Sequence, residues 1–480
     1  MYGEEKSDSL IVAANLANNP QGAESVERRS GAKGNAEQPH MRRTQSRESM
    51  SQRLSRVREA AKQRKKERFT ALFHLLTAEA LENAFLSLSR KAAAGVDGVR
   101  WKDYAENLKV NIADLHRRLH QGSYRAQPGR RHYIPKADGK QRPLGIASLE
   151  DKIVQYALVK ILNAVYENDF MGFSYGFRPG RSQHNALDAL ATGLVRTNVN
   201  WVLDADISQF FDKVSHEWLI RFIEHRIGDQ RVIRLIRKWL TAGTSEEGEW
   251  RASEEGTPQG AVISPLLANI YLHYVFDLWA HQWRRRHATG NVVMVRYADD
   301  IVIGFDKRID AQCFRIAMQR RLKEFGRFAA ENRASRGKGK PETFNFLGFT
   351  HISGKDRSGR FMLIRKTRRD RMTATLKAIK DGLRKRWHYS IPEQGKWLRR
   401  VVQGYLNYHS VPGNYPMMRK FRIYVTDLWR RALRRRSQQD DTTWTKANRL
   451  AAVWLPKVRV LHPWPVERFT ARHPRQEPGA

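Results

Sequence analysis

The sequence predicts an α+β fold built in two unlike parts, and three observations support this. Within residues 69–350, apolar residues recur with helical spacing in three stretches: Ala71–Ser89, Leu149–Tyr166 and His216–Ala242. The same part contains short β-rich runs at Trp201–Leu203, Val292–Val295 and Ile301–Phe305. The last two runs flank a tight acidic turn, which indicates a hairpin. After residue 365 the pattern changes to three or so amphipathic helices with a basic outer surface.

A large excess of positive charge runs through the chain. The 480 residues include 87 Lys and Arg against 49 Asp and Glu, which gives a net charge of +38. A field of that sign concentrates polyanions at the surface, so nucleic acids are candidate partners. The segment Arg42–Arg68 has 11 Lys or Arg against three Glu, and Arg365–Arg459 has 25 against six acidic residues. We therefore expect cationic surfaces near both ends of the ordered chain.

Composition also excludes several classes of protein. Hydrophobic residues make up 41% of the chain, enough to bury a core. No run of 18 apolar residues exists and the acidic, polar N-terminus does not resemble a signal peptide, so we expect no membrane partner. The single cysteine, Cys313, excludes an internal disulfide framework and a Cys-rich zinc site, so no zinc is expected. These facts favour a reducing, intracellular location; among such locations we expect the cytoplasm of a bacterium, in association with RNA or the nucleoid, although composition does not separate a bacterial from an organellar source.

Composition divides the chain into three regions. Residues 1–50 are rich in small polar and charged residues, and we expect a disordered tail. Residues 51–350 form the mixed part. Its first segment, residues 51–92, is a basic extension in which residues 51–68 predict a helix with a cationic face, or alternatively an ordinary solvated helix. Residues 351–475 form the helical part, whose Trp and Tyr side chains could stack on nucleic-acid bases or fill the helix core.

Two acidic segments give the strongest indication of chemistry. Asp299 and Asp300 lie in the turn of the expected hairpin, where adjacent carboxylates repel each other unless a cation is bound. Asp206 follows a short apolar run, and a carboxylate there can face the hairpin turn across a sheet. Three such carboxylates could hold two Mg²⁺ ions, one activating a 3′-hydroxyl and one stabilising a leaving pyrophosphate. A plain polar turn is the alternative for the Asp pair, and Asp204 and Asp212 are rivals of Asp206.

Three further segments are candidates for binding substrate. Phe211, five residues after Asp206, could fill the space of a ribose 2′-hydroxyl and so select deoxynucleotides; a core position, as for Phe210, is the alternative. The small residues and prolines of residues 255–265 predict a loop against which a template base pair can lie flat. Residues 133–145 predict a hairpin with cations on its arms, where Lys136 and Arg142 could bind a triphosphate.

Taken together, these motifs resemble those of one family. In chain order, AAGVDGV, YIPKADGKQRPLGI, SYGFRPGRS, DADISQFFD, GTPQGAVISPLLANIYL, YADD and FNFLGF resemble the group II intron reverse transcriptase-maturases. The resemblance continues through GYLNYHSVPGN and covers roughly residues 40–475. It implies a right-hand polymerase, with fingers and palm in residues 51–350 and an all-α thumb, the maturase X domain, in residues 351–475.

The resemblance also implies an activity, partners and site residues. The activity would be RNA-directed DNA polymerisation with a two-metal Mg²⁺ site, on an RNA template, a DNA primer or target DNA, and deoxynucleoside triphosphates. The chain would also bind its group II intron RNA to assist splicing and mobility. The residues carried over are Asp206, Asp299 and Asp300 as catalytic metal ligands, Phe211 as the sugar gate, Gln259, Gly260 and Tyr297 against the nucleotide and template, Arg178 and Arg181 near RNA in the fingers, and Arg434, Arg435 and Arg436 as RNA-binding residues of the thumb.

The sequence departs from the family pattern in two places. The chain stops near the expected end of the thumb and has no Cys pairs, so it resembles the endonuclease-lacking kind. A strand resembling LxLHPEKT is missing after the helix expected over Ala311–Phe328. We expect the basic, Gly-rich residues that follow not to replace that strand, which would leave a sheet edge open, although Lys338 or Lys340 could partly replace its lysine. Weak or absent DNA synthesis would follow, and the alternative function is a non-catalytic or weakly catalytic RNA-binding splicing factor.

Overall fold

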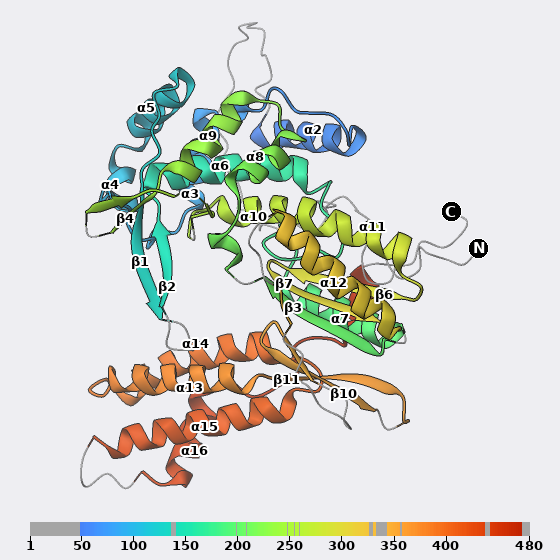
Figure 1. Cartoon of the computed structure of the whole chain (residues 1–480). Helices are drawn as coiled ribbons and strands as arrows, with labels where there is room; N and C mark the ends of the chain where they lie inside the picture. Colours follow the sequence, from blue (N-terminus) through green and yellow to red (C-terminus); the bar gives the residue numbers. More distant parts are fainter. Residues whose placement is uncertain are drawn as a thin grey trace, which may run out of the picture.

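The computed structural model describes residues 49–135, 141–197, 199–207, 209–246, 248–253, 255–258, 260–325, 330–332, 343–355, 358–436 and 442–472. The expected disordered tail therefore lies outside the described residues, except for its last two positions. Lys136, Gln259, Lys338 and Lys340 also lie outside them. Within the described ranges, a mixed α/β part is followed by a helical bundle that lies to one side of it (Figure 1). This arrangement confirms the α+β fold class.

The first part of the chain is mostly helical and packs around one buried helix. Helix α6 (Leu149–Tyr166) begins at Ser148, whose hydroxyl accepts a hydrogen bond from Asp151 N, and most of its side chains are buried. Helices α2 (Met50–Gln63) and α3 (Ala78–Ser87) pack against it. This part is completed by η1 (Phe73–Leu75), α4 (Trp101–Glu106) and α5 (Leu108–Gln121).

A small sheet carries the predicted basic hairpin. Strands β1 (Gly129–Pro135) and β2 (Gln141–Ile146) pair antiparallel, which confirms the hairpin, and β4 (Thr244–Glu246) and β5 (Glu249–Arg251) extend the sheet in the order β2-β1-β4-β5. In Figure 1 the hairpin projects on the side of the molecule where the helical bundle lies.

The central sheet contains the two acidic segments. Its strands are β6 (Val292–Tyr297), β7 (Asp300–Phe305), β3 (Trp201–Ile207) and β8 (Ala330–Asn332), in the order β6-β7-β3-β8. Helix α7 (Gln183–Arg196) packs against β6, and α12 (Arg308–Phe325) packs against β3 and β7. Almost all of β6 and β7 is buried, which explains their continuous apolar runs. The predicted β6–β7 hairpin is confirmed.

Apart from β4 and β5, the described chain between β3 and β6 is again helical. Its elements are η2 (Phe210–Asp212), α8 (His216–Glu224), α9 (Gln230–Thr241), α10 (Ser264–Leu272), the π-helical turn η3 (His273–Asp277) and α11 (Leu278–His287). The stretch with helical periodicity over His216–Ala242 forms two helices, α8 and α9. It is split because Asp229 caps the start of α9, and its other carboxylate oxygen accepts hydrogen bonds from Leu72 N and Phe73 N.

The C-terminal part begins with a sheet and continues as a bundle. Strands β9 (Phe344–Phe346), β10 (Phe349–Lys355) and β11 (Phe361–Thr367) pair in the order β11-β10-β9. The C-terminal bundle consists of α13 (Arg369–Arg384), α14 (Ile391–His409), α15 (Tyr415–Arg434) and α16 (Trp444–Trp454). It has its own core, which includes Trp429 and Phe421, so some of the aromatic side chains fill the bundle rather than its surface. The expected boundary at residues 350/351 falls inside β10.

The last helix leaves the bundle and returns to the central sheet region. Helix α17 (Pro465–Arg472) packs against α7, where the Arg468 guanidinium forms an ion pair with the buried Asp188 carboxylate. Phe469 joins the main core. Across the described ranges, no helix is both long enough and apolar enough to cross a membrane.

We expected that no strand would replace the missing one. This expectation was wrong, because the structure has a short strand at that edge of the sheet. Residues Ala330–Asn332 form β8, which pairs with the outer edge of β3 opposite Ala205, Asp206 and Ile207. The pairing covers the end of β3 that carries Asp206, because antiparallel partners align residue by residue. Helix α12 ends at Phe325, three residues before the expected end.

Candidate active site at the turn between strands β6 and β7

Backbone pairing brings the three predicted carboxylate positions to one end of the central sheet. In the antiparallel register, Asp206 of β3 lies directly opposite Asp300 of β7, and Asp300 is paired with Tyr297 of β6. Asp299 lies between Tyr297 and Asp300, in the short turn that joins β6 to β7. Asp204, a rival of Asp206, is opposite Val302 and buried, two residues farther from the turn. Asp212, the other rival, lies beyond the sheet in η2 and is exposed.

The electrostatics of the turn reflect crowded negative charge. The pKa of Asp299 is raised to about 6, first by burial of the carboxyl and then by the nearby Asp206 and Asp300 carboxylates. The Arg142 guanidinium acts in the opposite direction and lowers the same pKa, so this residue of the basic hairpin lies within electrostatic reach of the turn. The site therefore holds more negative charge than its own cations neutralise.

The donor set suits a hard divalent cation, but the side chains do not yet form a ligand cage. Carboxylate oxygens are the ligands that Mg²⁺ prefers. Within the part of the chain that the structure describes, no three Asp, Glu, His or Cys side chains are arranged to hold a metal ion. The assignment of Asp206, Asp299 and Asp300 as metal ligands stays a prediction, supported by the backbone register and by their electrostatic coupling.

Phe211 lies beside the acidic turn with part of its side chain exposed. Its neighbour Phe210 is buried in the core, as the sequence allowed, whereas Phe211 is only half-buried. Its ring meets that of Phe177 edge-to-face at 6.4 Å, and Phe177 lies 6.4 Å from the ring of Tyr297. Phe177 is half exposed and has a positive φ of 58°. These three rings form an aromatic rim next to the carboxylates.

The predicted close-approach loop lies between the Phe211 segment and the basic hairpin. Thr257 N donates to the Phe211 carbonyl at 2.7 Å. Gly256 has a φ of +86°, and a Cβ there would lie 2.9 Å from the Phe211 carbonyl oxygen. Gly260 has a φ of +107°, and a Cβ there would lie 2.9 Å from the Gly145 carbonyl oxygen. Glycine is required at both positions, because other residues are strained at such φ values and the backbones are in contact.

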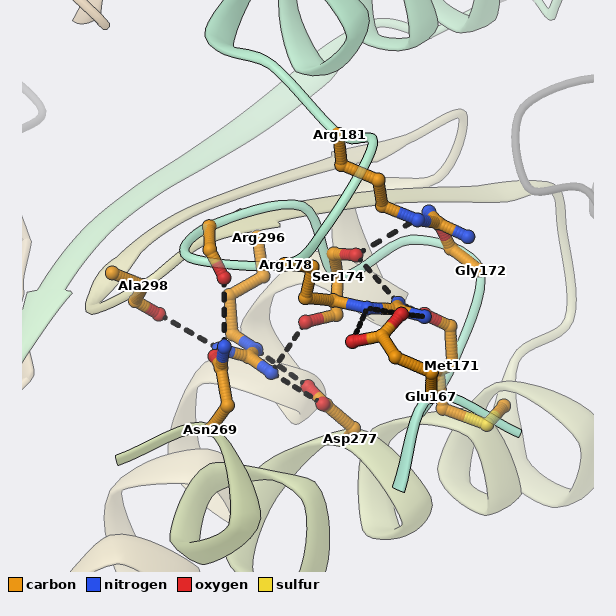
Figure 2. A network of polar contacts seen from close by, with 11 residues as sticks. Glu167, Met171, Gly172, Ser174, Arg178, Arg181, Asn269, Asp277, Arg296 and Ala298 are labelled. Carbon is orange, nitrogen blue, oxygen red and sulfur yellow. Dashed lines mark hydrogen bonds and ion pairs between the residues drawn. The ribbon is translucent and has the colours of Figure 1, made fainter. Parts of the chain in front are cut away.

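Arg178 and Arg181 were predicted to lie near RNA; the structure buries Arg178, leaves Arg181 half-buried, and shows both bonded to protein carbonyls. The Arg178 guanidinium forms an ion pair with Glu167 at 3.0 Å and donates to the carbonyls of Met171 and Ser174, at 2.8 Å each (Figure 2). Arg181 donates to the Gly172 carbonyl at 2.5 Å. Arg178 is only 5% exposed, so its hydrogen-bonding groups face protein and not solvent. Both side chains hold the loop of residues 171–178 in shape.

Sequence reasoning missed a buried polar cluster beneath the turn. Arg296, the last residue but one of β6, is fully buried and forms an ion pair with Asp277 (Figure 2). Asn269 and the Ala298 carbonyl also accept hydrogen bonds from it. A signal was available, because an arginine inside the apolar run VVMVR needs a buried anionic partner.

The three predicted thumb arginines lie on the surface of the C-terminal bundle. Arg434 ends α15, and Arg435 and Arg436 follow it; all three are exposed. Arg436 donates to the Tyr389 carbonyl. Tyr389, Tyr424 and Trp444 expose large parts of their rings on the same bundle. This combination of exposed cations and aromatic rings is typical of single-stranded nucleic-acid binding surfaces.

Comparison with known proteins decides what kind of site this is. Residues 134–351 match the family described as reverse transcriptase (RNA-dependent DNA polymerase), a range that includes both acidic segments and the loop between them. The chain is 37% identical over 223 residues to "Group II intron-encoded protein LtrA" of Lactococcus lactis subsp. cremoris. The matched region and these relatives support a group II intron reverse transcriptase-maturase. The mixed part is consistent with the palm and fingers of a polymerase, and a helical C-terminal region follows it.

Other relatives of this reverse transcriptase-maturase support the assignment. It is 43% identical over 206 residues to "Protein YkfC" of Escherichia coli (strain K12), which is 42% of this chain and 54% of the relative. The LtrA match covers 46% of this chain and 37% of the relative. "Nuclear intron maturase 2, mitochondrial" of Arabidopsis thaliana is 29% identical over 110 residues, 22% of this chain and 15% of that protein. The chain spans about half the length, or less, of these curated relatives.

Proposed function

We propose that this chain is an RNA-directed DNA polymerase of a group II intron, which also binds its intron RNA to assist splicing and mobility. Its substrates would be an RNA template, a DNA primer or target DNA, and deoxynucleoside triphosphates. It would act with that RNA in the bacterial cytoplasm. The observation that carries the proposal is the position of Asp206 opposite Asp300, with Asp299 beside them, at one end of a sheet within a matched reverse transcriptase region.

The residues around the turn have complementary roles in this proposal. Asp206, Asp299 and Asp300 would hold two Mg²⁺ ions, which supply charge neutralisation for phosphoryl transfer when bound. Arg142 would bind the triphosphate, because its positive charge already reaches Asp299. Phe211 would exclude a ribose 2′-hydroxyl from the position beside the carboxylates. Gly260 would keep its loop in close contact with the basic hairpin at Gly145, and the template base pair would lie against this loop.

The nucleic acid would be held by surfaces distant from the chemistry. The exposed Arg434, Arg435 and Arg436 and the exposed aromatic rings of the thumb suit a single-stranded or folded RNA. Helix α2 adds a second cationic surface near the start of the described chain. These contacts would supply most of the affinity, because phosphate neutralisation dominates nucleic-acid binding.

Primer extension tests the proposal. The unmodified chain, with an RNA template and an annealed DNA primer, should add deoxynucleotides only when a divalent cation is present. Asp206→Asn should abolish the addition and leave RNA binding unchanged. Asp381→Asn, an exposed carboxylate of the thumb helix α13, is the matched control and should extend like the unmodified chain. Extension that survives Asp206→Asn would remove Asp206 from the site.

One observation favours a second candidate function, a weakly catalytic or non-catalytic RNA-binding splicing factor. The strand that carries the family's lysine is missing from the sequence, and the replacement strand β8 has only three residues. A lost proton donor typically reduces the rate by about 10²–10⁴-fold. Grafting the HPEKT segment directly after Phe325, where α12 ends, distinguishes the two. Extension that appears only in the grafted chain supports the splicing factor, and robust extension by the unmodified chain supports the polymerase.

A further inference from the structure

The turn that carries Asp299 has an unfavourable backbone conformation that must be held in place. Ala298 has a φ of +58°, in the left-handed region. A non-glycine residue there costs of order 1 kcal/mol or more and persists only when its surroundings fix it. The Ala298 carbonyl belongs to the peptide that leads directly into Asp299. A group that binds this carbonyl therefore also fixes the position of the Asp299 backbone, from which the carboxylate side chain extends.

Arg296 binds this carbonyl and uses all its donors inside the protein. Nη1 donates to the Ala298 carbonyl at 3.0 Å and to Asn269 Oδ1 at 3.2 Å. Nη2 donates to Ser174 Oγ at 2.6 Å and to Asp277 Oδ2 at 2.5 Å, and Nε donates to Asp277 Oδ1 at 2.7 Å. A guanidinium has five N–H donors, so this set satisfies every one. Figure 2 shows the Arg296 guanidinium between the Ala298 carbonyl, Asn269 and Asp277, and because its donors form a rigid planar fork, these partners fix its orientation.

The partners of Arg296 are themselves fixed in place. Asp277 is fully buried at the end of the π-helical turn η3, between α10 and α11. Such turns are found frequently at functional sites. Asn269 of α10 accepts from Arg296 and donates from Nδ2 to the Gly176 carbonyl at 2.7 Å. Gly176 packs directly against the backbone of the turn. A Cβ at this position would collide with the Ala298 nitrogen, so only glycine fits.

The loop that contains Gly176 is attached to the same strand residue. Arg296 N donates to the Phe173 carbonyl at 2.9 Å, and Tyr175 N donates to the Arg296 carbonyl at 2.8 Å. Arg178 and Arg181 both donate to the carbonyl of Ser174, which lies between the two loop residues bonded to Arg296. The SYGFRPGRS motif, the helix pair around η3 and the β6–β7 turn thus meet at one guanidinium.

We propose that Arg296, held by Asp277 and Asn269, is the positioning residue of the active-site turn, and that it sets the affinity of the carboxylate site for divalent cations. The inference rests on the proposed function, because it assigns these residues a role at the same site. Arg296 touches neither substrate nor metal and acts through the Ala298 carbonyl. Groups that orient metal ligands typically change metal affinity by about 10–100-fold when they are mutated.

The test measures the binding of Mn²⁺ to the full chain. Electron paramagnetic resonance quantifies the Mn²⁺ that remains free. Asp206→Asn identifies the site signal, since it removes one predicted ligand. Arg296→Lys keeps the positive charge beside Asp277 but has three donors at one point instead of a planar fork. We expect it to weaken Mn²⁺ binding roughly 10- to 100-fold. In primer extension, the divalent cation requirement should rise by a similar factor at saturating primer–template.

Arg226→Lys is the matched control. Arg226 is equally buried, forms an ion pair with Asp169 at 2.7 Å, and donates to the Arg64 and Glu67 carbonyls. The Arg226→Lys variant should lose thermal stability, as Arg296→Lys does, but its affinity for Mn²⁺ should be unchanged. If Arg296→Lys does not fold, Asn269→Ala gives the same readout, because it releases the Gly176 carbonyl and one guanidinium donor.

Each outcome separates this inference from the proposed function. Mn²⁺ binding without primer extension in the unmodified chain defeats the polymerase proposal, while weakened binding in Arg296→Lys still supports the positioning role. Unchanged Mn²⁺ affinity in Arg296→Lys overturns the positioning role, whatever the polymerase activity. Equal weakening in Arg296→Lys and Arg226→Lys also overturns it, because the effect would then be general. Absence of a site signal in the unmodified chain overturns both.

Discussion

Replacing Asp299 with asparagine should stabilise the metal-free protein. The carboxylate is mostly buried beside two others, and its pKa is raised from 3.8 to about 6, mainly by burial. The folded state therefore binds this proton more tightly than the unfolded chain does. Asparagine has nearly the same shape and carries no charge, so it removes the cost of ionisation. The cation-binding function of the residue would be lost at the same time.

The magnitude follows from the pKa. Each pKa unit corresponds to about 1.4 kcal/mol, so ionised Asp299 costs the folded state roughly 3 kcal/mol. Below pH 3.8 the carboxyl is protonated in both states and the cost is absent. It grows as the pH rises from 3.8 to 6 and is complete above 6. The stabilisation by Asp299→Asn should therefore be full near about pH 7.5 and roughly half as large near about pH 5.

Urea denaturation at these two pH values, with a chelator present, measures the effect. Asp381→Asn, an exposed carboxylate 3.8 Å from Arg384, is the control and should change stability by less than about 0.5 kcal/mol. Adding Mg²⁺ should stabilise the unmodified chain and not Asp299→Asn, since ligands stabilise only the state that binds them. A loss of stability in Asp299→Asn near neutral pH, or a gain that does not depend on pH, would refute the reasoning.

Three further predictions concern the sugar gate, the thumb and the last helix. Phe211→Ala should raise ribonucleotide incorporation relative to deoxynucleotide incorporation in primer extension; an unchanged ratio would make Phe211 a packing residue. Replacing Arg434, Arg435 and Arg436 together by alanine should weaken RNA binding. The slope of log affinity against log salt should become shallower by up to about 0.7 for each phosphate that is no longer neutralised. An unchanged slope would show that these residues are not part of the RNA-binding surface. Arg468→Ala should lower the free energy of unfolding by about 1.5–3 kcal/mol, because a buried carboxylate of α7 loses one of its two cationic partners; no change in urea denaturation would show that α17 does not hold the thumb to the palm.

Local patterns were enough to predict the elements on which the site is built. Residues Leu149–Tyr166 were predicted as a helix with the observed bounds, because a serine cap and a long apolar pattern act within the segment itself. The β6–β7 hairpin followed from two apolar runs around a short turn. The position of Asp206 after a short apolar run indicated that it could face this turn, with Asp204 and Asp212 as rivals, and the register of the structure places Asp206 opposite Asp300. In each case the determining interactions are close in sequence or repeat along a strand.

Features set by distant contacts could not be predicted. The break between α8 and α9 depends on Asp229 binding the backbone near Leu72, and the return of α17 depends on Arg468 meeting Asp188, 280 residues earlier in the chain. Arg178 resembled a surface cation because its anionic partner, Glu167, is not in its own motif. β8 was missed because it depends on the free edge of β3 and has little strand propensity of its own.

The measurement that tests the central claim most directly is single-nucleotide addition opposite each of the four template bases. The unmodified chain, a DNA primer and four RNA templates that differ at one position are incubated with Mg²⁺ and all four deoxynucleoside triphosphates, and the added nucleotide is identified by mass. A templated polymerase with its site at Asp206, Asp299 and Asp300 adds the complementary deoxynucleotide in each case, and none when Mg²⁺ is removed. Addition that ignores the template base, or no addition while the primer–template remains bound, would contradict the account.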